Sequence, residues 1–159
     1  MPHFEYVAMS KPYDIFFGRK AYDIFAGYWP NAPRSDLGGR LNSALKCVVM
    51  SHILPLSWEN SHALDGDIVV AVQELKDQDG PPLQIHGSSA LIQTLQAHDP
   101  IDAFRIWTFP VVVGAGKRLF DGTASPRNYT VVHAETLENS VTHQCFRWAR
   151  LMLVLPRER

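Results

Sequence analysis

The sequence has few cysteines, no long apolar run and no excess of charge of either sign. Its two cysteines, Cys47 and Cys145, lie far apart and outside any Cys-x-x-Cys pattern, so neither a disulfide framework nor a zinc ribbon is expected. No apolar stretch approaches the roughly 18 residues that a transmembrane helix needs. Residues 1–9 lack the basic and apolar regions of a secretory signal. We therefore expect reduced thiols, a cytoplasmic location and no membrane partner.

The charges of the chain balance. The 15 basic and 16 acidic residues are interspersed, so no basic patch for nucleic acid is expected, and a small molecule is the expected partner. A chain of 159 residues, 46% of them hydrophobic, can bury a core without disulfides or a structural metal. We expect one domain that covers residues 1–159.

Several catalytic signatures are also missing. The sequence has no Gly-x-Ser-x-Gly, the turn that carries the nucleophile of many serine hydrolases. A Walker loop is not supported at Gly114, because the spacing to Gly116 is wrong and no serine or threonine follows Lys117. The seven histidines include no pair at i, i+4 and no partner cysteine at ligand spacing, so no metal site is expected.

The sequence does contain short apolar runs that alternate with helical segments. The spacing predicts strands at residues 13–17, 46–51 and 83–86, helices at 19–25, 67–76 and 88–98, and a loop at 29–39. After residue 100 the pattern changes, and strands are predicted at residues 103–113, 129–133 and 141–155. This order predicts an α/β fold with a mixed, mainly parallel sheet, helices on its faces and a C-terminal antiparallel hairpin.

One predicted strand ends in a glycine turn that opens a helix, with Gly87, Ser88 and Ser89 in the turn. The first turn of a helix presents unpaired N–H groups and the positive end of the helix dipole. Gly87 lets the backbone approach a ligand, and both serine hydroxyls can donate to phosphate oxygens. A phosphate group suits this turn, although a serine-capped glycine turn also occurs without any ligand.

A similar turn follows the first predicted strand. Gly18 permits a tight turn, and the cations Arg19 and Lys20 are unfavourable at a helix N-terminus unless an anion shares the site. The alternative is a solvated helix start. Ser51 and His52 follow the next strand, so we expect them at the same carboxyl edge, where open α/β sheets bind ligands. His52 is either a contact for an extra phosphate or an ordinary surface residue.

Four blocks of sequence carry a resemblance: residues 17–22 (FGRKAY), 58–61 (WENS), 86–91 (HGSSAL) and 110–120 (PVVVGAGKRLF). Taken together, they resemble the bacterial dihydrofolate reductase-like family, which shares its fold with the C-terminal reductase domain of the bifunctional riboflavin biosynthesis deaminase-reductase. The resemblance implies NADPH as cofactor and hydride transfer to a pterin-like or other small heterocyclic substrate. It implies a cofactor site made of Gly18, Arg19, Lys20, Gly87, Ser88 and Ser89 around the pyrophosphate, with Ser51 and His52 at the adenosine 2′-phosphate.

The sequence departs from the family pattern in ways that bear on activity. Ala21 stands where the family usually has a threonine whose hydroxyl supports the cofactor phosphate. The family's opening central strand and substrate loop have no counterpart, because residues 4–9 resemble the segment just ahead of the Gly-Arg strand. The first central strand is therefore missing from the expected fold, and the gap has to be covered by the N-terminal residues, by a partner subunit or by a rearranged sheet. We expect a homodimer or a larger assembly. No proton donor is identified, and a non-catalytic nucleotide-binding or assembly module is the alternative to a reductase.

Overall fold

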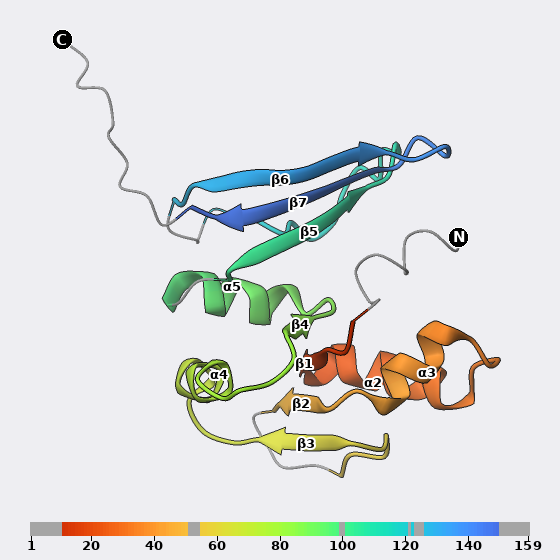
Figure 1. Cartoon of the computed structure of the whole chain (residues 1–159), viewed down its shortest axis with the longest axis vertical. Helices are drawn as coiled ribbons and strands as arrows, with labels where there is room; N and C mark the ends of the chain where they lie inside the picture. Colours follow the sequence, from red (N-terminus) through yellow and green to blue (C-terminus); the bar gives the residue numbers. More distant parts are fainter. Residues whose placement is uncertain (1–10, 51–54, 99–100, 121, 123–125, 150–159) are drawn as a thin grey trace.

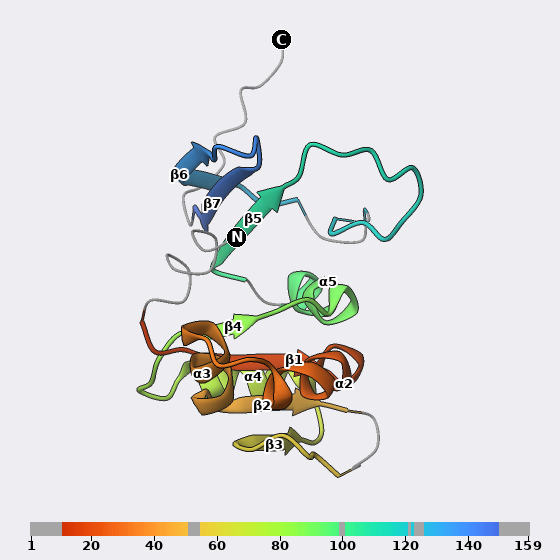
Figure 2. The ribbon, with the colours of Figure 1, turned by 90° about the vertical axis from the view of Figure 1, so that its right-hand side faces the viewer.

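The strands of the protein form two sheets (Figure 1). The computed structural model describes residues 11–50, 55–98, 101–120, 122 and 126–149. Strands β1 (Asp14–Gly18), β2 (Lys46–Val49), β3 (Ser61–Leu64) and β4 (Leu83–Ile85) form a parallel sheet in the order β3-β2-β1-β4. Strands β5 (Ala103–Thr108), β6 (Tyr129–Thr136) and β7 (Thr142–Trp148) form an antiparallel sheet in the order β5-β7-β6. The two sheets lie toward opposite ends of the long axis of the molecule (Figures 1 and 2).

Helices cover both faces of the parallel sheet. They are α2 (Arg19–Tyr28), the 3-10 turn η1 (Trp29–Asn31), α3 (Asp36–Ser43), α4 (Ile68–Lys76) and α5 (Ser89–His98). The side chains of Ile15 and Phe17 point to one face of β1 and pack with α2 and α3. Phe16 points to the other face and packs with α4 and α5, in keeping with the period of two along a strand. All three side chains are fully buried, so β1 is the centre of the core.

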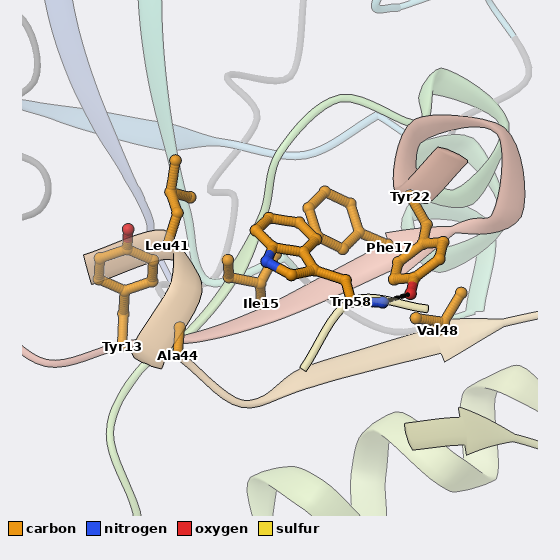
Figure 3. Close-up of a cluster of buried hydrophobic side chains, with 8 residues drawn as sticks. All are labelled: Tyr13, Ile15, Phe17, Tyr22, Leu41, Ala44, Val48 and Trp58. Atoms are coloured by element: carbon orange, nitrogen blue, oxygen red, sulfur yellow. Dashed lines mark hydrogen bonds between the residues drawn. The ribbon is translucent and has the colours of Figure 1, made fainter. Parts of the chain in front are cut away.

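Trp58 closes the core on the α2 side of the sheet (Figure 3). Its ring lies 6.2 Å from that of Phe17 and 6.3 Å from that of Tyr22. The backbone N–H of Trp58 donates to the Tyr22 hydroxyl at 2.9 Å, and its indole N–H donates to Asn42 Oδ1 at 2.7 Å. Only 3% of Trp58 is exposed, so the tryptophan of the 58–61 block is a core residue whose polar groups are satisfied within the protein.

Lys46, the first residue of β2, is buried beside Trp58. Lys46 is 0% exposed, and its ammonium group lies 4.3 Å from the centre of the Trp58 ring. The group donates to three backbone carbonyls, those of Asn42, Ala44 and Glu59, at 2.9, 2.8 and 3.1 Å. Burial lowers the pKa of Lys46 to about 8. All three donors of the ammonium group are thus used to hold the chain in place.

The expected α/β class is confirmed, with differences in detail. The loop predicted at residues 29–39 contains η1 and the start of α3, because Ser35 Oγ accepts a hydrogen bond from the Gly38 N–H at 3.1 Å and caps the helix. The strand predicted to run to residue 113 ends at Thr108, ahead of Pro110, which has no N–H to donate. The last predicted strand is β7, and residues 150–155 of that prediction lie outside the described residues.

β4 is an edge strand of the parallel sheet, and β5 is an edge strand of the antiparallel sheet. Among the described residues, β4 pairs only with β1, and β5 pairs only with β7. The antiparallel strands accordingly form a sheet of their own. Hydrogen bonds from Gln93 to the Arg118 carbonyl and from Arg127 to the Gln96 carbonyl, each 3.3 Å long, connect α5 to the segment between β5 and β6. None of the described helices has the length and apolar character needed to cross a bilayer.

Candidate functional site

The turns after β1 and β4 meet at the carboxyl edge of the parallel sheet. The two strands pair in parallel, with Phe16 opposite Ile85, so the residues that follow them leave the sheet side by side. The Gly18 N–H donates to Ser88 Oγ at 2.9 Å. A Cβ atom on Gly18 would lie 2.9 Å from that oxygen and 3.3 Å from the Ser88 Cβ. Glycine is therefore required at position 18 for the two turns to approach this closely.

The turn after β4 has an uncommon backbone conformation. Gly87 has φ +74° and Ser88 has φ +63°, both in the left-handed region. For a residue with a Cβ atom this conformation costs about 1 kcal/mol, and such strain clusters at binding sites. The conformation allows the Ser88 hydroxyl to accept from Gly18 while its own O–H stays free to donate. The strained serine thus joins the two turns and keeps one donor for a ligand.

Two helices begin at this edge of the sheet. Gly18 is the N-cap of α2 and provides no side-chain hydrogen bond to the first turn. Ser89 is the first residue of α5, and neither helix has an acidic residue in its first turn. The free N–H groups and the positive dipole ends of both helices therefore favour an anion at the same place. Lys20 is exposed in the first turn of α2 and adds to this potential.

The guanidinium group of Arg19 is only partly paired. Its Nε donates to both carboxylate oxygens of Asp23, at 2.8 and 3.0 Å, and its Cζ lies 5.9 Å from the centre of the Tyr22 ring. Its Nη1 atom is buried and has no hydrogen-bond partner among the described residues. A buried charged donor without a partner is costly, whereas a phosphate oxygen would satisfy it with a strong charge-assisted bond. The residues present at this edge therefore fit a phosphate-bearing cofactor.

His86, which precedes the second turn, does not supply positive charge. Its ring packs 5.9 Å from that of Tyr13 and 6.3 Å from that of Phe25, and its Nε2 lies 3.2 Å from Gln84 Oε1. Burial lowers the pKa of His86 to about 4, so the imidazole is neutral at pH 7. The positive potential of the site comes from Arg19, from the neighbouring lysine and from the helix ends.

The structure brings together most of the residues named from the sequence: Gly18, Arg19, Gly87, Ser88 and Ser89. Lys20 lies beside them on α2, with its side chain in solvent. Ser51 and His52 lie outside the described residues. The parallel register sets Val49, the last residue of β2, opposite Gly18, so the chain after β2 leaves from the same edge.

The sequence analysis expected no metal site, yet the structure gathers metal-ligating side chains on the antiparallel sheet. Glu135 Oε1 lies 3.2 Å from His133 Nε2 and 3.1 Å from His143 Nδ1. Helical spacing was the wrong test for these residues, because side chains at i and i+2 share one face of a strand. The patterns His133-x-Glu135 and His143-x-Cys145 carried the signal that was missed, although the predicted strand ended at residue 133 and β6 continues to Thr136.

Comparison with known proteins identifies relatives for most of the chain. Residues 16–143 match the protein family described as the RibD C-terminal domain. The protein YyaP of Bacillus subtilis, whose name assigns it no activity, is 27% identical over 137 residues, which cover 84% of this chain and 73% of YyaP. The family match, over residues 16–143, includes both turns of the candidate site.

Solved structures share the fold. A protein named for riboflavin biosynthesis from a Shewanella species superposes with a TM-score of 0.74 at 22% identity and covers 94% of this chain and 84% of its own. The diaminohydroxyphosphoribosylaminopyrimidine deaminase/5-amino-6-(5-phosphoribosylamino)uracil reductase of Thermotoga maritima gives a TM-score of 0.56 at 14% identity, over 87% of this chain and 45% of that one. A pyrimidine reductase-like protein of Corynebacterium diphtheriae gives 0.55 at 10% identity, over 87% of this chain and 76% of that one.

Proposed function

The chain belongs to the RibD C-terminal domain family, and from this premise we propose that it is an NADPH-dependent reductase acting on a pterin-like or other small heterocyclic compound. Relatives of the same fold include proteins named as reductases of riboflavin biosynthesis type. The observation that carries the proposal is the direct hydrogen bond between Gly18 and Ser88, which brings the first turns of α2 and α5 to the same edge of the sheet. Two helix N-termini side by side, with Arg19 at the start of α2, suit a pyrophosphate.

In this proposal the chain itself binds and orients the cofactor. The cofactor-binding residues are Gly18, Arg19, Lys20, Gly87, Ser88 and Ser89 at the pyrophosphate, with Ser51 and His52 at the 2′-phosphate. Arg19 and the Ser88 hydroxyl donate hydrogen bonds, and the first turns of α2 and α5 supply backbone N–H groups. NADPH, when bound, supplies the hydride. The small residue Ala21 leaves the phosphate without the extra hydroxyl that the family pattern usually provides.

The test of binding is a titration of the full chain with NADPH and with NADH, followed by cofactor fluorescence and by thermal unfolding. At a concentration about 100 times its dissociation constant, NADPH should add about 2.7 kcal/mol to the unfolding free energy. We expect Arg19→Ala to weaken binding at least tenfold, and Arg147→Ala, an exposed arginine on β7, to leave it unchanged. Absence of binding by either nucleotide would contradict the proposal.

Turnover is measured separately, as loss of NADPH absorbance with a panel of pterins and aminopyrimidines. Oxidation of NADPH that depends on one of these compounds and is lost in Arg19→Ala supports the reductase. Tight NADPH binding with no turnover across the panel would favour the alternative, a nucleotide-binding module without hydride transfer. The two assays therefore separate cofactor binding from catalysis.

We further propose that residues 1–159 act as one cytoplasmic domain that forms a homodimer. The apolar segment after β5 supports the dimer, because Phe109, Val111, Val112 and Val113 are 54, 67, 99 and 79% exposed. The free thiols of Cys47 and Cys145 suit a reducing compartment. Light scattering after gel filtration tests the dimer, and a monomeric mass at assay concentrations would contradict it.

A further inference from the structure

A second group of reactive side chains lies on one face of the antiparallel sheet, apart from the cofactor turns. The register of β6 and β7 sets Glu135 opposite His143 and His133 opposite Cys145. Residues opposite each other in a sheet, and residues two apart along a strand, share a face. Two imidazoles, a carboxylate and a thiol therefore project from the same small area of the sheet.

We propose that His133, Glu135 and His143 bind a divalent transition metal ion, with zinc as the expected ion. One ligand atom from each residue lies within 4.8 Å of the other two. Ligands placed about 2.0–2.1 Å from zinc at tetrahedral angles are about 3.3 Å apart. The two distances to Glu135 Oε1, 3.2 Å from His133 and 3.1 Å from His143, agree with that spacing. Two histidines and a glutamate form a zinc ligand set that leaves a fourth position for water.

The surrounding side chains hold His143 in place for this role. Its side chain is only 4% exposed, and the ring of Trp107 stacks on it at 4.5 Å with an angle of 10° between the planes. Cys145 Sγ lies 3.5 Å from the Nε2 of His143, so Nδ1 is the nitrogen on the side of Glu135. A ligand ring fixed from both sides loses little freedom when an ion binds.

The other two ligands are open to solvent. The side chains of His133 and Glu135 are 50% and 40% exposed, so an ion reaches them without any opening of the fold. A hollow of about 230 Å³ on this face is lined in part by His133, His143 and Cys145. Without an ion, the carboxylate accepts hydrogen bonds from both imidazoles, and this hydrogen-bonded network is the alternative that an experiment must distinguish from a metal site.

The test uses the full chain without a histidine tag, stripped of metal with a chelator and titrated calorimetrically with zinc chloride. We expect one ion per chain with micromolar or tighter affinity. His133→Ala and Glu135→Gln remove exposed ligands without disturbing the core and should weaken binding at least tenfold. The matched control is His62→Ala, an exposed histidine on β3, which should bind zinc as the wild type does.

A second readout is the visible spectrum of the cobalt(II) complex. Three protein ligands and a water give the intense visible bands of a tetrahedral site, and these bands should disappear in both ligand variants. The absence of stoichiometric zinc binding by the wild-type chain would overturn the proposal. So would an affinity that is the same in His133→Ala, Glu135→Gln and the wild type.

Discussion

The contact between Gly18 and Ser88 allows the construction of the cofactor site to be tested directly. In Gly18→Ala, the new Cβ would lie 2.9 Å from Ser88 Oγ and 3.3 Å from Ser88 Cβ. Carbon atoms in contact prefer separations of about 3.5–4.0 Å, so the turn has to move. Overpacking of this kind costs about 1–3 kcal/mol, and weakening the hydrogen bond between Gly18 and Ser88 costs about 1 kcal/mol. We expect Gly18→Ala to lower the unfolding free energy by about 2–4 kcal/mol.

Ser88→Gly removes both atoms that the new methyl group would meet. It loses the hydrogen bond to Gly18, worth about 1 kcal/mol, but relieves a left-handed backbone conformation that costs a similar amount. The single substitution should therefore be close to neutral. The double variant Gly18→Ala/Ser88→Gly should be less destabilised than the sum of the single variants, with a coupling energy of about 1–3 kcal/mol. Urea unfolding of the four proteins measures this energy.

The same four proteins separate folding from binding. Ser88→Gly removes a hydroxyl donor from the proposed phosphate site, so NADPH affinity should fall about tenfold while stability hardly changes. The double variant should regain stability without regaining affinity. Stability effects that add within about 0.5 kcal/mol would refute the steric argument. Full recovery of NADPH affinity in the double variant would refute the binding role of Ser88.

Three further predictions concern the fold around the site. Because burial lowers the pKa of His86 from 6.5 to about 4, the unfolded chain binds more protons between these values, so stability should fall by about 3 kcal/mol as the pH is lowered through this window. His86→Gln should flatten that slope in urea unfolding at pH 4–7. Lys46→Met removes the donor from the carbonyls of Ala44 and Glu59, while the Asn42 carbonyl keeps a hydrogen bond from Asn60, and should cost about 2–4 kcal/mol in the same assay at pH 7. Asp67→Ala removes the cap that accepts from the N–H groups of Val69 and Val70 in the first turn of α4 and should cost about 1 kcal/mol, and an unchanged unfolding midpoint would contradict it.

Sequence patterns predicted the elements that bury a regular apolar face. The apolar run of β1 and the periodic residues of α4 and α5 are examples. β3 was missed because Ser61–Leu64 is short and partly exposed and has no apolar alternation. α3 was missed because Gly38 and Gly39 lower its helix propensity. The Ser35 cap compensates for that weakness, and so does the packing of Gly38 against Trp29. A Cβ atom added to Gly38 would lie 3.8 Å from the Trp29 ring.

The site could be predicted only in part. The two glycine turns were recognised because each follows a strand and opens a helix. The bond between Gly18 and Ser88 was not predicted, since it joins positions 70 residues apart and depends on the register of β1 and β4. That Arg19 Nη1 has no partner was not predicted either, because it depends on the Asp23 carboxylate accepting a hydrogen bond from Nε of the same side chain. Sequence spacing identifies which turns approach an edge, but only packing decides which donors remain free.

The topology brings together the two glycine turns after β1 and β4, each of which is a weak sequence signal by itself. From β1 the chain builds β2 and β3 on one side, and it then returns to place β4 on the other side of β1. α2 packs on one face of the sheet and α5 on the opposite face, so their N-termini approach the same edge from both sides. Open α/β sheets bind ligands at such a switch point. The N-termini of α2 and α5 therefore begin side by side at this edge, and both helix dipoles would stabilise an anion placed there.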